Sequence, residues 1–365
     1  MAETAILKGR DYALVELSRR LARLLRVLGE AEYDALAGRL QQLPIEAPVF
    51  VTGLARSGTT MVLTLLSQAD GVATHRYRDF PFLCVPLAWN WLQDRLGGGG
   101  EQAVERPHRD RIRITKESAE AFEEPIWQQF FPWVHDPARC HVMGGATSHA
   151  EFEAFFAGHL RKILWLRGGR RYLSKGNYNL ARIEYLARLF PSARFVVPVR
   201  APLAHVRSLA EQHALFCRYA EDDARVPRYL AAAGHYEFGP QRRPVNFDPT
   251  RIGEIEAAWR EGDDARGYAR QWAQAYAHVD RLRSDPEIAG RILVLRFEDF
   301  CAQPGASLRR LLDFCGLTDA AGRVAAAAGT VSAPENRKPV EPHLAQSVWS
   351  EVAAVAGRFG YAAAA

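Results

Sequence analysis

The stretch VFVTGLARSGTTMVLTLLSQ, residues 49–68, decides the fold. It opens with Val49–Thr52, a short apolar run rich in β-branched residues, which is typical of a buried strand. A turn bounded by Gly53 and Gly58 follows, and an apolar helical pattern begins at Thr59. A strand, a glycine-bounded loop and a helix in this order predict a site where backbone N–H groups and the helix N-terminus bind an anion.

The loop departs from the Walker pattern of nucleoside-triphosphate enzymes. That pattern, G-x-x-x-x-G-K-[ST], requires a lysine at the position that Thr59 occupies. The loop contains Arg56 instead, and a guanidinium can make bidentate contacts to one terminal oxyanion group. We therefore expect a different anion from the triphosphate of a Walker site, bound by the loop residues Arg56, Ser57, Gly58, Thr59 and Thr60.

A second cationic strand end lies further along the chain. The apolar run RFVVPVR ends at Arg200, and a helical pattern starting at Pro202 places Ser208 about two turns into the next helix. A metal-dependent nucleotide enzyme would have an acidic residue at such a strand end to bind Mg²⁺. Arg200 and Ser208 predict a second phosphate site, and two separate anion sites suit a nucleotide with a 5′ group and a ribose phosphate.

Strand patterns alternate with helical patterns along most of the chain. RRYLSKG (170–176) and RILVLRF (291–297) add two strands, each followed by a helical pattern. This alternation predicts an α/β fold, a P-loop-like parallel sheet flanked by helices. We expect a single domain over 1–365, with three further parts: an N-terminal helical segment (1–45), a mostly helical stretch (101–165) and a lid insertion (218–264). Helical insertions would form the acceptor lid.

The overall composition limits the classes of function. The 365 residues are 48% hydrophobic and have a net charge of +5, which favours anionic ligands but is too small to indicate nucleic-acid binding. The five cysteines are scattered without zinc-binding spacing. No signal peptide and no apolar stretch of membrane-spanning length is present, so we expect a cytoplasmic protein.

The N-terminal segment contains a basic amphipathic pattern. Residues 17–29, LSRRLARLLRVLG, combine leucines at helical spacing with four arginines. Such a helix either packs on its own domain, which is the ordinary case, or binds a partner or an acidic membrane surface. The pattern therefore leaves open a weak contact with a membrane surface through residues 13–28.

Taken together, the motifs resemble the sulfotransferases that use 3′-phosphoadenosine 5′-phosphosulfate. RSGTT (56–60) resembles their 5′-phosphosulfate loop, and Arg200, Pro202 and Ser208 resemble their 3′-phosphate site. The likeness extends over 172–215 and 290–317. It is nearer to the broad bacterial and tyrosylprotein branch than to the cytosolic phenol and steroid branch, whose first loop generally has a lysine where this chain has Arg56.

The resemblance implies in-line transfer of a sulfuryl group to a hydroxyl or amine of a small-molecule or glycan acceptor, without a metal. From its position after the second strand, we expect Lys175 to reach the sulfuryl oxygens or an acidic acceptor. Arg337 and Lys338 resemble an arginine–lysine pair that closes over the 3′-phosphate, although Pro339 follows where that pair has a glycine. Two other readings remain: a non-catalytic nucleotide- or glycan-binding protein with this fold, and a P-loop kinase.

The general base is open among several side chains. Asp79 ranks slightly above His75 in the segment after the first helix, because Arg76 and Arg78 would keep its carboxylate ionised. The ordinary alternatives are an ion pair of Asp79 with one of these arginines and a hydrogen-bonded loop histidine. Glu123 and Glu124 are further candidates, resembling an acidic pair of this branch, with a solvated acidic turn as the alternative.

Overall fold

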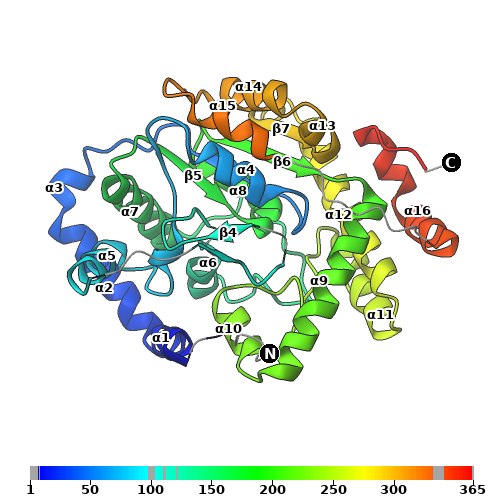
Figure 1. Cartoon of the computed structure of the whole chain (residues 1–365), viewed down its shortest axis with the longest axis horizontal. Coiled ribbons are helices and arrows are strands. Elements are labelled where there is room, and N and C mark those ends of the chain that lie inside the picture. The colour runs from blue at the N-terminus through cyan, green and yellow to red at the C-terminus, as the bar shows by residue number, and fades with distance from the viewer. Residues whose placement is uncertain are drawn as a thin grey trace.

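The computed structural model describes residues 7, 9–97, 103–109, 112–120, 122–331 and 341–363. Its centre is a parallel sheet with the strand order β2-β5-β1-β6-β7, and β1 lies in the middle (Figure 1). The predicted α/β class, with a parallel sheet flanked by helices, is confirmed. The strands are β1 (Val49–Val51), β2 (Val72–Ala73), β5 (Arg171–Lys175), β6 (Arg194–Val199) and β7 (Ile292–Arg296).

The central strands are apolar throughout because both faces of the sheet are covered. On one face, Phe50 of β1 stacks on Phe195 of β6, with 5.7 Å between the ring centroids. On the other face, Val49 and Val51 pack in a second core with the helix that follows the first loop, α4 (Thr59–Leu66). The same residues that make β1 buried therefore fix the loop after it at the carboxyl edge of the sheet.

The helices form layers on both sides of this sheet (Figure 1). With α4, the second core contains side chains of α14 (Pro304–Cys315) and α15 (Arg323–Ala327), and α13 (Phe297–Ala302) connects β7 to α14. The larger core contains side chains of α6 (Glu124–Phe130), α7 (Ala150–Arg167), α8 (Ile183–Leu189), α9 (Pro202–Asp222), α12 (Asp264–Arg283) and α16 (Pro342–Ala356).

The N-terminal segment is helical, as its pattern predicts. It forms α1 (Gly9–Arg20), α2 (Ala22–Ala35) and α3 (Ala37–Leu40). Helix α2 contacts α7 and also α5 (Pro86–Arg95). No helix in the described ranges is long and apolar enough to cross a membrane.

The prediction of helix through most of 101–165 is wrong for its first part. The described residues there form a short antiparallel pair, β3 (Val104–Glu105) and β4 (Arg113–Ile114), followed by irregular chain up to residue 120. The alternating sequence IRIT at 112–115 suits a strand better than a helix. Among the described residues of this stretch, only α6 and α7 are α-helical.

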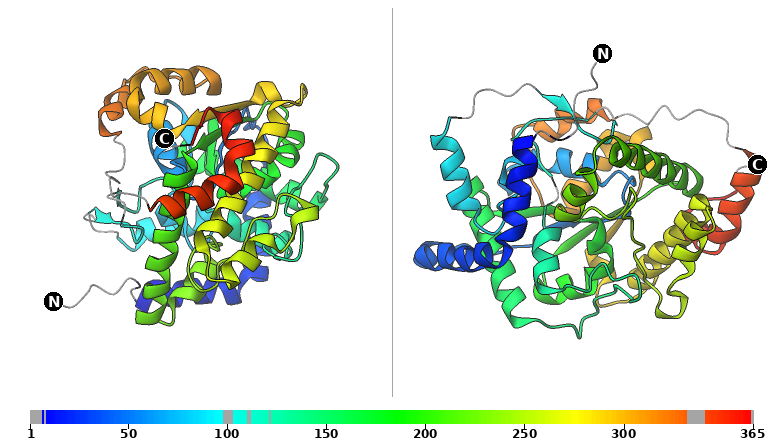
Figure 2. Two further views of the ribbon diagram at one scale, coloured as in Figure 1. Left: turned by 90° about the vertical axis from the view of Figure 1, so that its right-hand side faces the viewer. Right: turned by 90° about the horizontal axis from the view of Figure 1, so that it is seen from below.

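The 218–264 segment includes the last turn of α9, which ends at Asp222, and the chain that follows it. It contains α10 (Val226–Ala232), the short helix η3 (Pro249–Arg251) and α11 (Glu254–Arg260), and α11 packs against α12 (Figure 2). Its irregular stretch is tied down: the backbone N–H of Tyr236 donates to the Tyr178 hydroxyl at 2.9 Å, and that of Val245 donates to Gln271 at 3.0 Å.

Candidate active site at the carboxyl edge of the sheet

The first loop has the backbone that its glycines predict. Gly58 has φ of 102°, and a Cβ there would approach the Phe297 ring to 2.5 Å, so only glycine fits. Arg56 also has a positive φ, of 71°, an uncommon conformation for a residue with a side chain. The fully buried Ser57 Oγ has no hydrogen-bond partner within the described residues. The loop therefore has strained backbone and a hydroxyl available at one place.

The two anion motifs of the sequence meet in space. Arg56 Nε donates to Ser208 Oγ at 3.2 Å, and Arg200 Nη1 donates to the Arg56 carbonyl oxygen at 3.3 Å. This contact arises because β1 and β6 are neighbours in the sheet and both end at the same edge. We call Arg56, Arg200 and Ser208 the strand-edge cluster.

The strand-edge cluster concentrates positive charge in a partly buried place. Burial, and after it the charge of Arg56, lower the pKa of Arg200 below its ordinary value. The Arg200 guanidinium also lies over the Phe297 ring at 5.3 Å. Two guanidiniums at this proximity repel each other, and an anion bound between them would offset that repulsion.

Buried side chains that the sequence analysis missed hold this edge in place. His205 donates from Nε2 to the Ala55 carbonyl oxygen at 2.8 Å, and burial lowers its pKa to about 3, so the ring is neutral. From α12, Trp272 donates to the Arg200 carbonyl oxygen at 3.3 Å, and Tyr276 donates to that of Pro198 at 3.1 Å. The spacing of Trp272 and Tyr276 by four residues on a predicted helix was the available signal.

Lys175 ends β5 beside the first loop and is buried. Its Nζ lies 3.2 Å from Oε1 of Glu120, a residue that the sequence analysis did not select. Glu120 also accepts a hydrogen bond from the Tyr77 hydroxyl at 2.6 Å, and Arg106 lies 3.6 Å from it. Arg106 in turn donates to Thr60 Oγ1 at 3.3 Å. The irregular chain before α6 therefore contacts the start of α4.

A second polar chain connects the first loop to the 218–264 segment. Thr59 Oγ1 donates to Asn177 Oδ1 at 3.4 Å, and Asn177 Nδ2 donates to Glu237 at 2.8 Å. Glu237 in turn lies 3.3 Å from Nδ1 of His235. Burial raises the pKa of Glu237, but interactions with His235 and Asn177 outweigh it and bring the pKa to about 2. The Glu237 carboxylate is thus ionised, and it contacts Nδ1 of the His235 imidazole.

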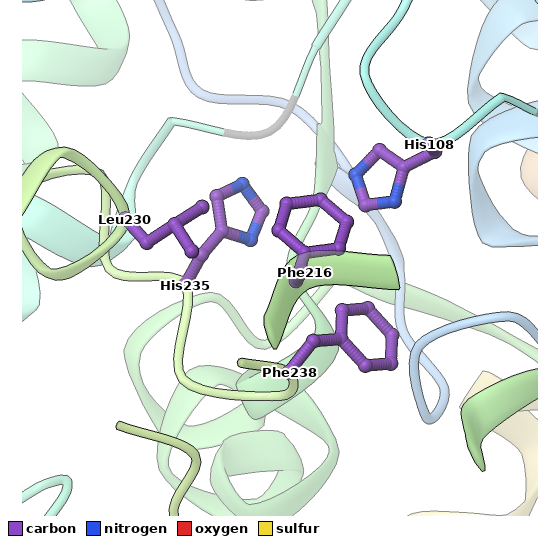
Figure 3. A pocket seen from close by; sticks show the side chains of 5 residues that line it. All are labelled: His108, Phe216, Leu230, His235 and Phe238. Carbon is purple, nitrogen blue, oxygen red and sulfur yellow. The ribbon is translucent and has the colours of Figure 1, made fainter. Parts of the chain in front are cut away.

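The His235 ring lines a small hollow of about 20 Å³, whose other walls are His108, Phe216, Leu230 and Phe238 (Figure 3). His108 comes from the chain before α6 and Phe216 from α9, so three separate segments build the hollow. Burial and the charges of Arg106, His235 and Arg56 lower the pKa of His108 to about 3. His108 Nδ1 also lies 2.9 Å from Oε1 of Gln212, one helical turn after Ser208 on α9, so the hollow is close to the strand-edge cluster.

Asp79 lies in a different environment from the one that its sequence neighbours indicate. The prediction that Arg76 and Arg78 keep it ionised is wrong, because these two arginines pair with Glu117 and Asp94. The ion-pair partner is Arg167 of α7, whose Nη2 lies 2.5 Å from Asp79.

The remaining contacts of Asp79 fill both of its oxygens. Asn90 donates to Oδ1 at 2.9 Å, the Arg76 N–H donates to Oδ2 at 2.9 Å, and His75 Nδ1 lies 3.3 Å from Oδ2. Burial alone would raise the pKa of Asp79, yet His75 and Arg167 hold it well below its ordinary value. The Asp79 side chain has no exposed surface.

His75 connects Asp79 to a second histidine. Its Nε2 lies 2.9 Å from Nε2 of His159 on α7, and both rings are buried. We call Asp79, His75, His159 and Arg167 the interior cluster. Neither nitrogen of His75 is left to accept a proton from an outside molecule.

Glu123 and Glu124 are also engaged. Glu123 accepts hydrogen bonds from the Tyr172 hydroxyl at 2.6 Å and from Asn179 at 3.3 Å. Glu124 binds the Arg182 guanidinium through both oxygens, at 2.7 and 2.8 Å, and its pKa is lowered to about 2. The alternative of a solvated acidic turn is wrong, because Glu123 is buried and Glu124 largely so. Arg337 and Lys338 lie outside the described residues.

Comparison with solved structures agrees with the fold. Sulfotransferase STF1 from Mycobacterium tuberculosis H37Rv is similar over 92% of this chain and 82% of its own, with a TM-score of 0.51 and 14% identity. Sulfotransferase STF9 from Mycobacterium avium is similar over 91% and 82%, with a TM-score of 0.52 and 14% identity. These two structures share the fold. No curated protein sequence matches the chain significantly.

The profile of the sulfotransferase family matches residues 48–255, which is more than half of the chain. The match includes the first loop, the end of β5 and the whole strand-edge cluster. The chain belongs to the sulfotransferase family and is a sulfotransferase.

Proposed function

We propose that this sulfotransferase moves a sulfuryl group from 3′-phosphoadenosine 5′-phosphosulfate to a hydroxyl or amine of an acceptor. The observation that carries the proposal is the strand-edge cluster, in which Arg56 contacts Ser208 and Arg200 contacts the backbone of Arg56. It joins two cationic strand ends and a hydroxyl at one edge of the sheet. A nucleotide with two separate anionic groups matches that charge distribution.

The chain's residues fit such a donor. Arg56 and the N–H groups of the first loop would hold the 5′-phosphosulfate, with the Ser57 hydroxyl as a further donor. Arg200 and Ser208 would hold the 3′-phosphate. When bound, the donor supplies the activated sulfuryl group. Positive groups that face the departing phosphate stabilise its developing charge, and removing one such group costs about 10²–10³ in rate.

We place the general base at His235, with Glu237 as its positioning residue. Asp79, His75, Glu123 and Glu124 have their oxygens or nitrogens engaged by buried partners. His235 differs, because Nδ1 faces Glu237 and no described residue hydrogen-bonds to Nε2. A carboxylate on Nδ1 makes Nε2 the proton acceptor, and Nε2 belongs to a ring that lines the hollow.

In this proposal, the hollow forms one side of the acceptor site. Phe216, Leu230 and Phe238 supply apolar walls, and the two histidines supply polar atoms. We infer an acceptor with an apolar group next to the hydroxyl or amine that receives the sulfuryl group. A small molecule and a glycan with an apolar substituent both satisfy this description.

The test is transfer of labelled sulfate from the donor onto a cell extract, with identification of the labelled product. Wild type should label at least one product, and Arg56→Ala should label none above background. Arg218→Ala removes an exposed arginine of α9 and is the matched control, which should label as wild type does. Binding of adenosine 3′,5′-bisphosphate without any labelled product would favour a non-catalytic nucleotide-binding protein, and preference for ATP with Mg²⁺ would favour a kinase.

A further inference from the structure

Exposed apolar side chains gather on two helices at one edge of the molecule. Leu24 is 50% exposed, Val27 and Trp91 are 55% exposed, and Leu96 is 70% exposed. Helices α2 and α5 lie side by side there, on the opposite side of the sheet from α16 (Figure 1). We call the following set, which includes the end of α1, the N-terminal apolar face: Leu17, Leu21, Leu24, Val27, Leu28, Trp91, Leu92 and Leu96.

The N-terminal apolar face has a fixed position, because buried contacts hold α2 against the rest of the protein. Gly29 packs on the chain before α5 so closely that a Cβ would lie 2.4 Å from the Cys84 carbonyl oxygen. Glu32 accepts a hydrogen bond from the Ala88 N–H at 2.6 Å, and Lys162 of α7 lies 3.0 Å from Glu32. These buried contacts fix one side of α2, so Leu24 and Leu28 lie on its outer side, while Leu17 and Leu21 precede α2, at and just after the end of α1.

Positive charge flanks the apolar face. Residues 17–28 contain four arginines and no acidic residue. The side chains of Arg19 and Arg20 are 59% and 70% exposed, although both pair with Glu16 on their own helix. Arg23 is exposed, and Arg95 stacks over Trp91 at 4.3 Å. The fourth arginine, Arg26, lies over the Phe130 ring and belongs to the buried side.

The combination of exposed apolar side chains and arginines favours one of two binding partners, a second copy of the chain or an anionic lipid surface. A second copy of the chain would bring two arginine-flanked faces together, and like charges at an interface oppose association. An anionic lipid surface offers hydrocarbon to the leucines and tryptophan, and headgroup charge to the arginines. We propose that the N-terminal apolar face docks the protein on an anionic lipid bilayer, with α2 and α5 lying in the interface.

This proposal does not rest on sulfuryl transfer and is tested without it. The full chain is sedimented with phosphatidylcholine vesicles, with and without phosphatidylserine. Wild type should bind the phosphatidylserine vesicles about tenfold more strongly, and added salt should weaken that binding. The combined variant Leu21→Ser, Leu24→Ser, Leu28→Ser should lose about tenfold in binding. Its side chains are exposed, and a circular dichroism melt checks that it folds.

Ile252→Ser is the matched control, because Ile252 is 36% exposed and lies outside the face. It should bind vesicles as wild type does. Equal binding by wild type and the leucine variant, or no binding of wild type to phosphatidylserine vesicles, would overturn the proposal. Light scattering that shows a dimer of wild type and a monomer of the leucine variant would identify a second copy as the occupant instead.

Discussion

The strand-edge cluster and the interior cluster both contain arginine side chains. They differ in the groups that lie next to these arginines. In the interior cluster, Asp79 and Arg167 pair at 2.5 Å, and further donors fill both carboxylate oxygens. In the strand-edge cluster, two arginines lie together, and the nearby Ser57 hydroxyl has no partner among the described residues. A buried cluster whose carboxylate oxygens are all engaged stabilises the fold, whereas two arginines brought together beside the N-terminus of a helix suit an anionic ligand.

The largest expected effect separates His235 from the interior histidine. His235→Gln should lower kcat by about 10²–10⁴, because the acceptor proton loses its base, and leave binding of adenosine 3′,5′-bisphosphate unchanged. The comparison variant is Glu237→Gln, which should lower kcat less and shift the pH profile of kcat. Normal turnover by His235→Gln at saturating donor would remove it from the reaction.

Asp79→Asn should show the opposite pattern. It leaves the Arg167 guanidinium buried without its counter-charge, which costs about 3–5 kcal/mol in the free energy of unfolding. The kcat of the folded variant should stay within about threefold of wild type, since Asp79 does not touch the hollow or the strand-edge cluster. Urea denaturation and turnover of the same preparation measure both quantities. A large loss of kcat with normal stability would restore Asp79 as the base.

The two arms of the donor site can be separated by the choice of donor. Arg200→Ala and Ser208→Ala should weaken binding of donors that have a 3′-phosphate by about tenfold or more, because a charged hydrogen bond is lost. Adenosine 5′-phosphosulfate, which lacks that phosphate, should be affected much less. Competition binding with both nucleotides measures the ratio, and equal losses for the two would contradict the placement of the 3′-phosphate.

The smallest effect concerns pH and Glu124. Its pKa is about 2 in the folded protein because of Arg182 and His135, against about 4.3 in an unfolded chain. A lowered folded pKa gives stability that is present above the unfolded value and is lost as pH falls toward 2. Wild type should therefore lose about 1–3 kcal/mol more than Glu124→Gln between pH 5 and about pH 2.5. Parallel acid-unfolding curves for the two proteins would show that Glu124 is not held in this way.

The strand-edge cluster could be predicted from the sequence because its residues are placed by local patterns. A strand followed by a glycine-bounded loop fixes Arg56, and a strand followed by a helix fixes Arg200 and Ser208. Parallel strands end at the same edge, so neighbouring strand ends meet without further information.

The surroundings of Lys175 and of the hollow could not be predicted in the same way. Glu120 and His235 lie on irregular chain, and contacts distant in sequence place them, such as Lys175 with Glu120 and Tyr236 with Tyr178. Asp79 shows the same limit. Its partner Arg167 is 88 residues away on α7, whereas the adjacent arginines pair with other acids. Proximity in sequence therefore gave the wrong partner.

The most direct test of the donor site is calorimetric titration of adenosine 3′,5′-bisphosphate into wild type, Arg56→Ala and Arg218→Ala. The two arginines of the strand-edge cluster predict binding to wild type and to Arg218→Ala without any metal, and at least tenfold weaker binding to Arg56→Ala, since a charge-assisted contact is lost. Equal affinity of all three proteins, or binding of ATP with Mg²⁺ in place of the bisphosphate, would contradict a phosphosulfate donor at this edge of the sheet.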